Sequence, residues 1–209
     1  MDYNKLVALP SSCRRLVTES AKTKDVKGIK TLFDRLFYGK HAIVRYSLES
    51  VERFMPIKIP KQVWKDKRGH CFELSLFWIA CLKALKIESQ YCTKFSWLQD
   101  GVFWNHAFVK ARIDGRTILM DPGRRIFSAR FRKYRELSKR QTIGNYYANY
   151  AEMLNPLHSK SQRKVRLTKT QQRELARKAL KCASLALKYD PKETRAKNLI
   201  ETYKRLSYL

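Results

Sequence analysis

The chain has 209 residues, a hydrophobic content of 44% and a formal net charge of +27, from 45 Lys and Arg against 18 Asp and Glu. This length allows one domain of ordinary size plus an appendage, and this hydrophobic content excludes global disorder. There is no 18-residue apolar span and no apolar stretch near the N-terminus. A transmembrane helix and a cleaved signal peptide are therefore not expected, and we expect a cytoplasmic protein.

The positive charge admits two interpretations. A field of this sign attracts polyanions, which include nucleic acid, anionic membrane and acidic protein. The same composition also suits an ordinary solvated surface rich in lysine. Charge predicts attraction better than it predicts a function, so both interpretations stay open.

The cysteines predict neither a disulfide scaffold nor a metal site. There is no CxxC motif and no Cys/His cluster at zinc spacing, and free thiols fit a reducing compartment. We expect no metal and no cofactor. The five cysteines are Cys13, Cys71, Cys81, Cys92 and Cys182.

The first seventy residues predict helices that support the domain. Apolar residues recur at helical spacing from Val26 to Phe37, and Gly39 then favours a helix end. A second short helix is expected between residues 47 and 55. Pro56 and Pro60 predict an extended linker over residues 56–60.

Cys71 follows Gly69 and His70 and opens an apolar run that ends near Ile87. A helix that is apolar almost all round is typical of the buried centre of a domain. In the first turn, the helix dipole and the free backbone N–H groups favour a thiolate, and these N–H groups could also hold an oxyanion.

A β-hairpin follows the cysteine helix. His106 to Ile113 predicts one strand, Asp114-Gly115 a two-residue turn, and Arg116 to Asp121 the return strand. This turn pairs Ile113 with Arg116 and makes Asp121 a diagonal neighbour of His106 on one face. The opposite face is apolar. The hairpin alone therefore predicts a contact between a histidine and a carboxylate.

Together these residues favour a thiol enzyme over inert alternatives. A buried cysteine is usually an unreactive small hydrophobe, and a lone His near an acid is usually structural. A thiol at a helix start, a base and an orienting acid are what thiol acyl transfer needs.

The ordered motifs resemble the transglutaminase-like branch of the papain-type thiol fold. The resemblance rests on Gly69-x-Cys71-x-Glu73 with its apolar helix, on His106-Ala-Phe-Val, on Asp114-Gly115, and on Leu119-Met-Asp121-Pro122. It covers roughly residues 23–123. It implies an α+β fold whose core has a central cysteine-bearing helix packed on an antiparallel sheet.

The resemblance also implies roles for individual residues. Cys71 would be the nucleophile, His106 the general base and acid, and Asp121 the orienting carboxylate. A side-chain oxyanion donor is expected upstream of the cysteine, with Gln62 and Trp64 as candidates. Such proteins cleave or exchange amide bonds of proteins or peptides through a thioester, although the family also includes inactive scaffolds.

The segment after the hairpin alternates basic and aromatic residues. Such a segment could grip phosphates and stack bases, or it could form a solvated surface around a few aromatic anchors. The candidate polyanion-binding residues are Arg124, Arg125, Arg130, Arg132, Lys133 and Arg135.

The C-terminal part predicts two helices. Ala179, Ala183, Ala186 and Pro191 resemble the second helix of a tetratricopeptide repeat, but only about one repeat is present. The helices either cap the main domain or form a small docking surface. We therefore predict a transglutaminase-like domain over residues 1–157, a basic linker over residues 158–169 and an α-helical hairpin over residues 170–209.

Two functions from different classes remain. The first is a Cys-His-Asp enzyme that acts on an amide bond, as a hydrolase or an acyltransferase. The second is a catalytically silent module that uses its basic surface to bind nucleic acid or an acidic protein.

Overall fold

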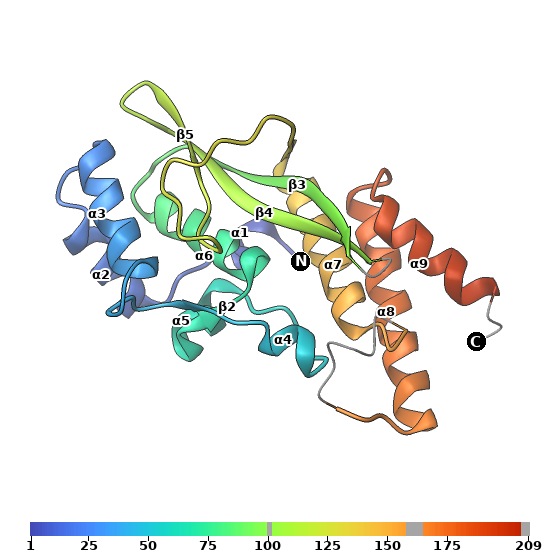
Figure 1. The fold of residues 1–209 in the computed structure, drawn as a ribbon. Helices are drawn as coiled ribbons and strands as arrows, with labels where there is room; N and C mark the ends of the chain where they lie inside the picture. The colour runs from blue at the N-terminus through green and yellow to red at the C-terminus, as the bar shows by residue number, and fades with distance from the viewer. Residues whose placement is uncertain (100–101, 158–164, 206–209) are drawn as a thin grey trace.

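The computed structural model describes residues 1–99, 102–157 and 165–205, which form an α+β fold (Figure 1). None of the helices in these ranges is long and apolar enough to cross a membrane. In chain order the elements are α1 (Tyr3–Leu6), α2 (Ser11–Ser20), α3 (Val26–Phe37), β1 (Arg45–Tyr46), α4 (Glu49–Glu52), α5 (Pro60–Asp66), β2 (Arg68–Gly69), α6 (Cys71–Ala84), β3 (Ser89–Gln99), β4 (Val102–Ile113), β5 (Arg116–Met120), β6 (Arg135–Leu137), α7 (Lys139–Leu154), α8 (Lys169–Tyr189) and α9 (Thr194–Arg205).

Helix α6 is the centre of the fold. Every residue from Phe72 to Leu82 is buried, as expected for a helix that is apolar on all sides. One side of α6 packs on strands β3 and β4, while α2 and α5 contact it elsewhere (Figure 1). The Trp78 indole also donates a hydrogen bond to the Met120 sulfur of β5 at 3.2 Å. The prediction of a central cysteine-bearing helix is confirmed.

The sheet is antiparallel, with strand order β5-β4-β3-β6. Strands β4 and β5 pair Ile113 with Arg116, which is the register predicted from the Asp114-Gly115 turn. Both turn residues have positive φ, as a two-residue hairpin turn requires. The predicted apolar face, with Ala107 and Val109, is buried in the same core as α6.

The elements before the cysteine support α6 and bring a distant strand to it. Helix α3 has its predicted bounds, whereas α1, α2 and α5 were not predicted. Pro60 is predicted at the end of the extended linker 56–60, but it is the first residue of α5. Proline is well tolerated at the first helical position. Strands β1 and β2 pair in parallel, so Tyr46 lies opposite Gly69, two residues before Cys71.

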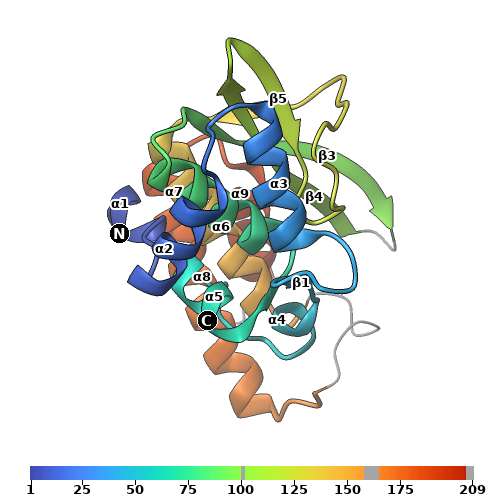
Figure 2. The same cartoon turned by 90° about the vertical axis from the view of Figure 1, so that its left-hand side faces the viewer.

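The two C-terminal helices pack on α7 and form a second apolar cluster with it (Figure 2). The small residues Ala179, Ala183 and Ala186 are fully buried there, which lets the helices approach closely. The buried Arg195 donates to Asn149 of α7 at 2.8 Å and to Glu193 at 2.8 Å. Residues 158–164 of the predicted linker lie outside the described residues, and the domain boundaries stay a prediction.

The contact between α7 and α8 predicts whether a substitution at Gly144 stabilises or destabilises the protein. A Gly→Ala change inside a helix ordinarily stabilises it by about 0.5–1 kcal/mol. At Gly144 the added methyl group would lie 2.9 Å from Asp190 Cβ and 3.1 Å from the Ala186 carbonyl oxygen. We expect Gly144→Ala to lower the free energy of unfolding by about 1–3 kcal/mol in urea titrations. Lys181→Ala, at an exposed position of α8, is the control and should change it by less than about 0.5 kcal/mol. A more stable Gly144→Ala protein would contradict this packing.

Candidate active site

Cys71 is the first residue of helix α6 and follows the N-cap residue His70. It remains partly exposed to solvent, whereas the rest of the helix is buried to Leu82. The loop after β5 approaches the cysteine closely, since a methyl group on Gly123 would lie 3.0 Å from Cys71 Cβ and 3.2 Å from its Cα. A side chain at position 123 would therefore press on the thiol-bearing residue.

His106 and Asp121 form the contact that the hairpin predicted. His106 Nε2 lies 2.5 Å from Asp121 Oδ2. The β4–β5 ladder ends at Met120, and Asp121 pairs instead with Ile126 across the next turn. The buried carboxylate also accepts the Arg124 backbone N–H at 3.0 Å, and the Arg124 guanidinium lies 3.9 Å away. Asp121 is thus held by the end of a strand and by the turn that follows it.

The Cys71 side chain contacts the ring of His106, and the two groups shift each other's pKa. Burial opposes the thiolate, but the contacts with His106 and then His70 outweigh it and lower the pKa of Cys71 to about 6. Burial likewise opposes the imidazolium, but Asp121 and then Cys71 raise the pKa of His106 to about 9. Because His106 Nε2 faces Asp121, we infer that Nδ1 is the nitrogen nearest the thiol.

These shifts favour a thiolate–imidazolium pair near neutral pH. The thiolate and the imidazolium stabilise each other, so both groups are charged between about pH 6 and about pH 9. A thiolate is the nucleophilic form of cysteine, and an imidazolium can donate a proton to a leaving group. The structure therefore brings the three predicted residues together in the order Cys71, His106, Asp121.

A second histidine, His70, borders the thiol. Its Nδ1 accepts the Phe72 backbone N–H at 3.3 Å, which requires an unprotonated Nδ1. Burial lowers the pKa of His70, but the Glu73 carboxylate, 3.6 Å from Nε2, and Cys71 produce a net increase. Protonation of Nδ1 would break the cap of α6, so the cap and the raised pKa act in opposite directions. His70 had no predicted role.

Glu73 organises the chain that leads to the cysteine. Its buried carboxylate accepts the His70 backbone N–H at 3.0 Å and the Lys58 backbone N–H at 2.7 Å. The Gly-x-Cys-x-Glu motif therefore carries its own structural acid, which fixes the turn before α6 and ties residue 58 to it. A buried carboxylate is tolerated when it accepts such hydrogen bonds.

Tyr46 also lies near the thiol, and sequence reasoning missed it. Burial raises the pKa of its hydroxyl, and the negative charges of Cys71 and Asp121 raise it further. The residue as a whole is 41% exposed, but the pKa concerns the hydroxyl alone. Tyr46 therefore keeps its proton and can donate a hydrogen bond. Tyr46 is placed near the thiol by the pairing of β1 with β2. Each of these strands has only two residues, so the sequence shows no periodic pattern that would predict the pairing.

The two predicted oxyanion donors, Gln62 and Trp64, both belong to α5. The Gln62 side chain accepts the Ile59 backbone N–H at 3.0 Å and caps α5. The Trp64 indole donates to the Ser12 hydroxyl at 3.2 Å and stacks on Phe77. These contacts do not assign either side chain to the thiol, and their oxyanion role stays a prediction.

The predicted polyanion-binding residues lie on and after the loop that begins at Asp121. Arg135 differs from the others, because it forms an ion pair with Asp190 at 2.7 Å. The remaining five are exposed: Arg124, Arg125, Arg130, Arg132 and Lys133.

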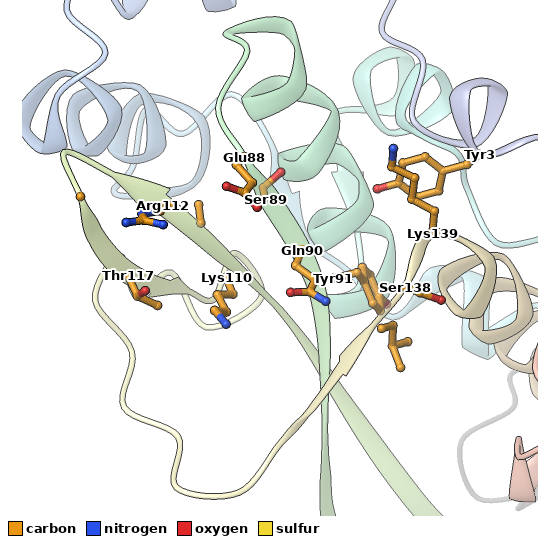
Figure 3. Close-up of a pocket in the computed structure, with 13 residues that line it drawn as sticks. Tyr3, Glu88, Ser89, Gln90, Tyr91, Lys110, Arg112, Thr117, Ser138 and Lys139 are labelled. Atoms are coloured by element: carbon orange, nitrogen blue, oxygen red, sulfur yellow. The ribbon is translucent and has the colours of Figure 1, made fainter.

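A pocket of about 670 Å³ lies apart from these residues (Figure 3). Tyr3, Tyr91, Arg112 and Lys139 are among its lining residues, and neither Cys71, His106 nor Asp121 contributes to it. Across the described ranges, no group of three or more metal-ligating side chains is found. The thiol at the start of α6 therefore lies outside this pocket.

The depressed thiol pKa predicts selective alkylation. We expect the rate of Cys71 modification by iodoacetamide to rise with pH through a midpoint near 6, because only the thiolate reacts. Burial raises the pKa of Cys92 to about 12, so Cys92 is the internal control. His106→Ala should move the Cys71 midpoint upward, since the thiolate loses its partner. Peptide mapping by mass spectrometry measures each site, and a Cys71 that reacts no faster than Cys92 would contradict the activated thiol.

Comparison with known proteins places this arrangement in a family. No curated protein matches the chain. A solved structure of a putative cysteine protease from Cytophaga hutchinsonii is 17% identical, with a TM-score of 0.43, and the match covers 58% of this chain and 42% of that one. The chain thus spans less than half of that protein's length. The family described as the transglutaminase-like superfamily matches residues 14–122, which is more than half of the chain and includes Cys71, His106 and Asp121. The chain belongs to the transglutaminase-like superfamily.

Proposed function

We propose that the protein is a thiol enzyme that cleaves or exchanges an amide bond of a protein or peptide through a thioester on Cys71. The observation that supports this most is the continuous contact from the buried Asp121 through His106 to a partly exposed thiol. An inert core cysteine packs as a small hydrophobic residue, whereas a thiol beside a buried His-Asp pair is typical of a functional site.

In the first half-reaction, the Cys71 thiolate attacks the amide carbonyl carbon and forms a C–S bond. The carbonyl oxygen becomes an oxyanion. The His106 imidazolium donates its proton to the amide nitrogen, the C–N bond breaks, and ammonia or an amine leaves. Asp121 stabilises the imidazolium before this transfer and holds the ring by its other nitrogen.

In the second half-reaction, neutral His106 takes a proton from water or from an acceptor amine as it attacks the thioester carbon. The C–S bond breaks and the thiolate re-forms beside an imidazolium. Water gives a carboxylic acid and an amine gives a new amide. One set of residues therefore serves a hydrolase and an acyltransferase, and the acceptor decides between them.

For the oxyanion, we propose two donors, the backbone N–H of Cys71 and the hydroxyl of Tyr46. The first lies at the N-terminus of α6, where the helix dipole favours negative charge. The second keeps its proton beside the thiolate and projects from a strand that pairs with Gly69. This proposal prefers Tyr46 to Trp64, whose indole N–H donates to Ser12, and to Gln62, whose side-chain oxygen caps α5.

The alternative is a silent module that binds nucleic acid or an acidic protein. The five exposed cations after Asp121 favour it. A Cys71→Ser protein that keeps its full biological activity would favour this alternative over the enzyme.

Catalysis can be sought without knowing the substrate. Incubation with a complex peptide mixture in ¹⁸O-water detects hydrolysis of any amide, and a labelled primary amine detects transfer. We expect Cys71→Ala and His106→Ala to reduce either product by about 10³-fold or more, and Asp121→Asn by about 10²–10⁴-fold. The matched control is Cys182→Ala, which removes a thiol from the second apolar cluster, on α8. Equal product from Cys71→Ala and the intact protein would refute the enzyme.

The same assay has an expected pH dependence. Below about 6 the thiol is protonated and cannot attack, so kcat/KM should rise as pH increases through this value. Above about 9 the imidazolium loses the proton that the leaving group needs, so kcat/KM should fall. Tyr46→Phe tests the proposed donor: we expect kcat to fall by about 10²–10³-fold, with the alkylation midpoint of Cys71 moved much less. An unchanged kcat would remove Tyr46 from the site.

A further inference from the structure

We propose that the thiol site takes an acidic protein segment as its substrate, and that the loop of residues 123–134 recognises it. This inference rests on the proposed function and adds the substrate class to it. We call this segment the basic loop.

The basic loop is fixed at the active site by several contacts. Asp121 and Ile126 exchange backbone hydrogen bonds of 2.8 and 3.0 Å, and the Ala129 N–H donates to the Leu119 carbonyl at 2.7 Å. Phe131 then stacks on Phe108 of β4 at 4.1 Å between ring centroids. The loop is therefore a second layer on the sheet, beside β3 and β4 (Figure 2), and not a loose connection.

The loop reaches the catalytic base itself. The Phe131 ring centroid lies 6.2 Å from that of His106. Phe127 packs against Phe33 of α3 at 5.6 Å. The aromatic side chains of the loop therefore point into the domain, and the residues between them point away from it. Gly123 lies against Cys71 and Phe131 lies beside His106, so both parts of the loop border the site that a substrate chain would enter.

The exposed residues of the loop include five cations. Residues 123–134 contain Arg124, Arg125, Arg130, Arg132 and Lys133, all exposed, and no Asp or Glu. Only Arg124 approaches a carboxylate, that of Asp121. Within the described part of the chain, the other four form no ion pair.

Two acids near the end of the loop, Glu136 of β6 and Asp190 at the C-cap of α8, are already paired with cations outside residues 123–134. Glu136 pairs with Lys110 at 2.7 Å, and Asp190 pairs with Arg135 at 2.7 Å. The loop therefore presents an uncompensated positive field at the rim of the thiol site, and such a field attracts and orients a partner of opposite sign.

The site chemistry favours a protein over a nucleic acid as this partner. A thiolate with an imidazolium acts on an acyl carbon, which peptides carry in their backbone and in Gln and Asn side chains. Anionic groups on a peptide are Asp and Glu. An amide with acidic residues on one side satisfies both the thiol and the loop.

Binding can be tested apart from turnover, with full-length Cys71→Ala protein and fluorescence anisotropy. The probes are a Glu-rich peptide with one Gln, its twin in which every Glu is replaced by Ser, and single-stranded RNA of equal charge. We expect the Glu-rich peptide to bind at least about tenfold more tightly than its twin, and to lose this advantage as salt increases.

Two paired substitutions locate the binding. Arg130→Gln with Arg132→Gln should remove most of the preference for the Glu-rich peptide. Arg173→Gln with Arg177→Gln removes the same charge from exposed positions of α8 and should leave the preference intact. Equal binding of the two peptides, equal effects of the two double substitutions, or tighter loop-dependent binding of RNA would each overturn the inference.

The intact protein separates this inference from the proposed function. If it turns over both peptides with the same kcat/KM, the enzyme stands and the acidic substrate fails. If it turns over neither peptide while Cys71→Ala binds the Glu-rich one through the loop, the recognition surface stands and the thiol enzyme fails.

Discussion

The buried carboxylate of Asp121 is the constraint on which the site depends. A charge removed from water is costly unless it is paired and hydrogen-bonded, and Asp121 has three partners: the His106 ring, the Arg124 N–H and, more distantly, the Arg124 guanidinium. Because it is fully buried at the end of a strand, it cannot turn away from His106. It therefore holds the histidine charged, and a charged histidine in turn holds Cys71 as the thiolate. At each step, a neighbour of opposite charge offsets the cost of burying a charged group: Asp121 raises the pKa of His106, and His106 lowers the pKa of Cys71.

Two rigid elements meet at this chain of contacts. The thiol comes from the start of a helix buried on every side, and the His-Asp pair comes from a hairpin whose apolar face packs on that helix. The packing of Ala107 and Val109 on α6 thus sets how far the His106 ring lies from Cys71. The glycine at position 123 lets the loop after β5 come within contact of the cysteine. The relative positions of Cys71 and His106 therefore follow from the packing of the hairpin on α6 in the core.

The parts of this architecture that repeat locally could be predicted from the sequence. The Asp114-Gly115 turn and strict alternation determine the register as far as Met120, and this register brings Asp121, the next residue, close to His106. The apolar run after Cys71 likewise predicts a buried helix. What could not be predicted depends on short or distant pairings. Two-residue strands leave no periodic pattern, so Tyr46 could not be placed beside Gly69. The sequence predicts a linker up to Pro60, where α5 begins, because proline occurs both in extended segments and at the first position of a helix. Gln62 was considered for the oxyanion, but its side chain caps that unpredicted helix.

The charge of +27 has a different meaning once its position is known. Beneath the surface the acids Asp121 and Glu73 are buried, and the Cys71 thiol lies beside two histidines that lower its pKa. Above it, the loop that begins at Asp121 is positive and has no acid of its own over residues 123–134. This layering separates two tasks. The histidines lower the pKa of the Cys71 thiol, while the proposed recognition of a substrate falls to the exposed cations. Total charge does not say where the cations lie, whereas the contacts of Ile126, Ala129 and Phe131 hold this basic loop against the sheet beside His106.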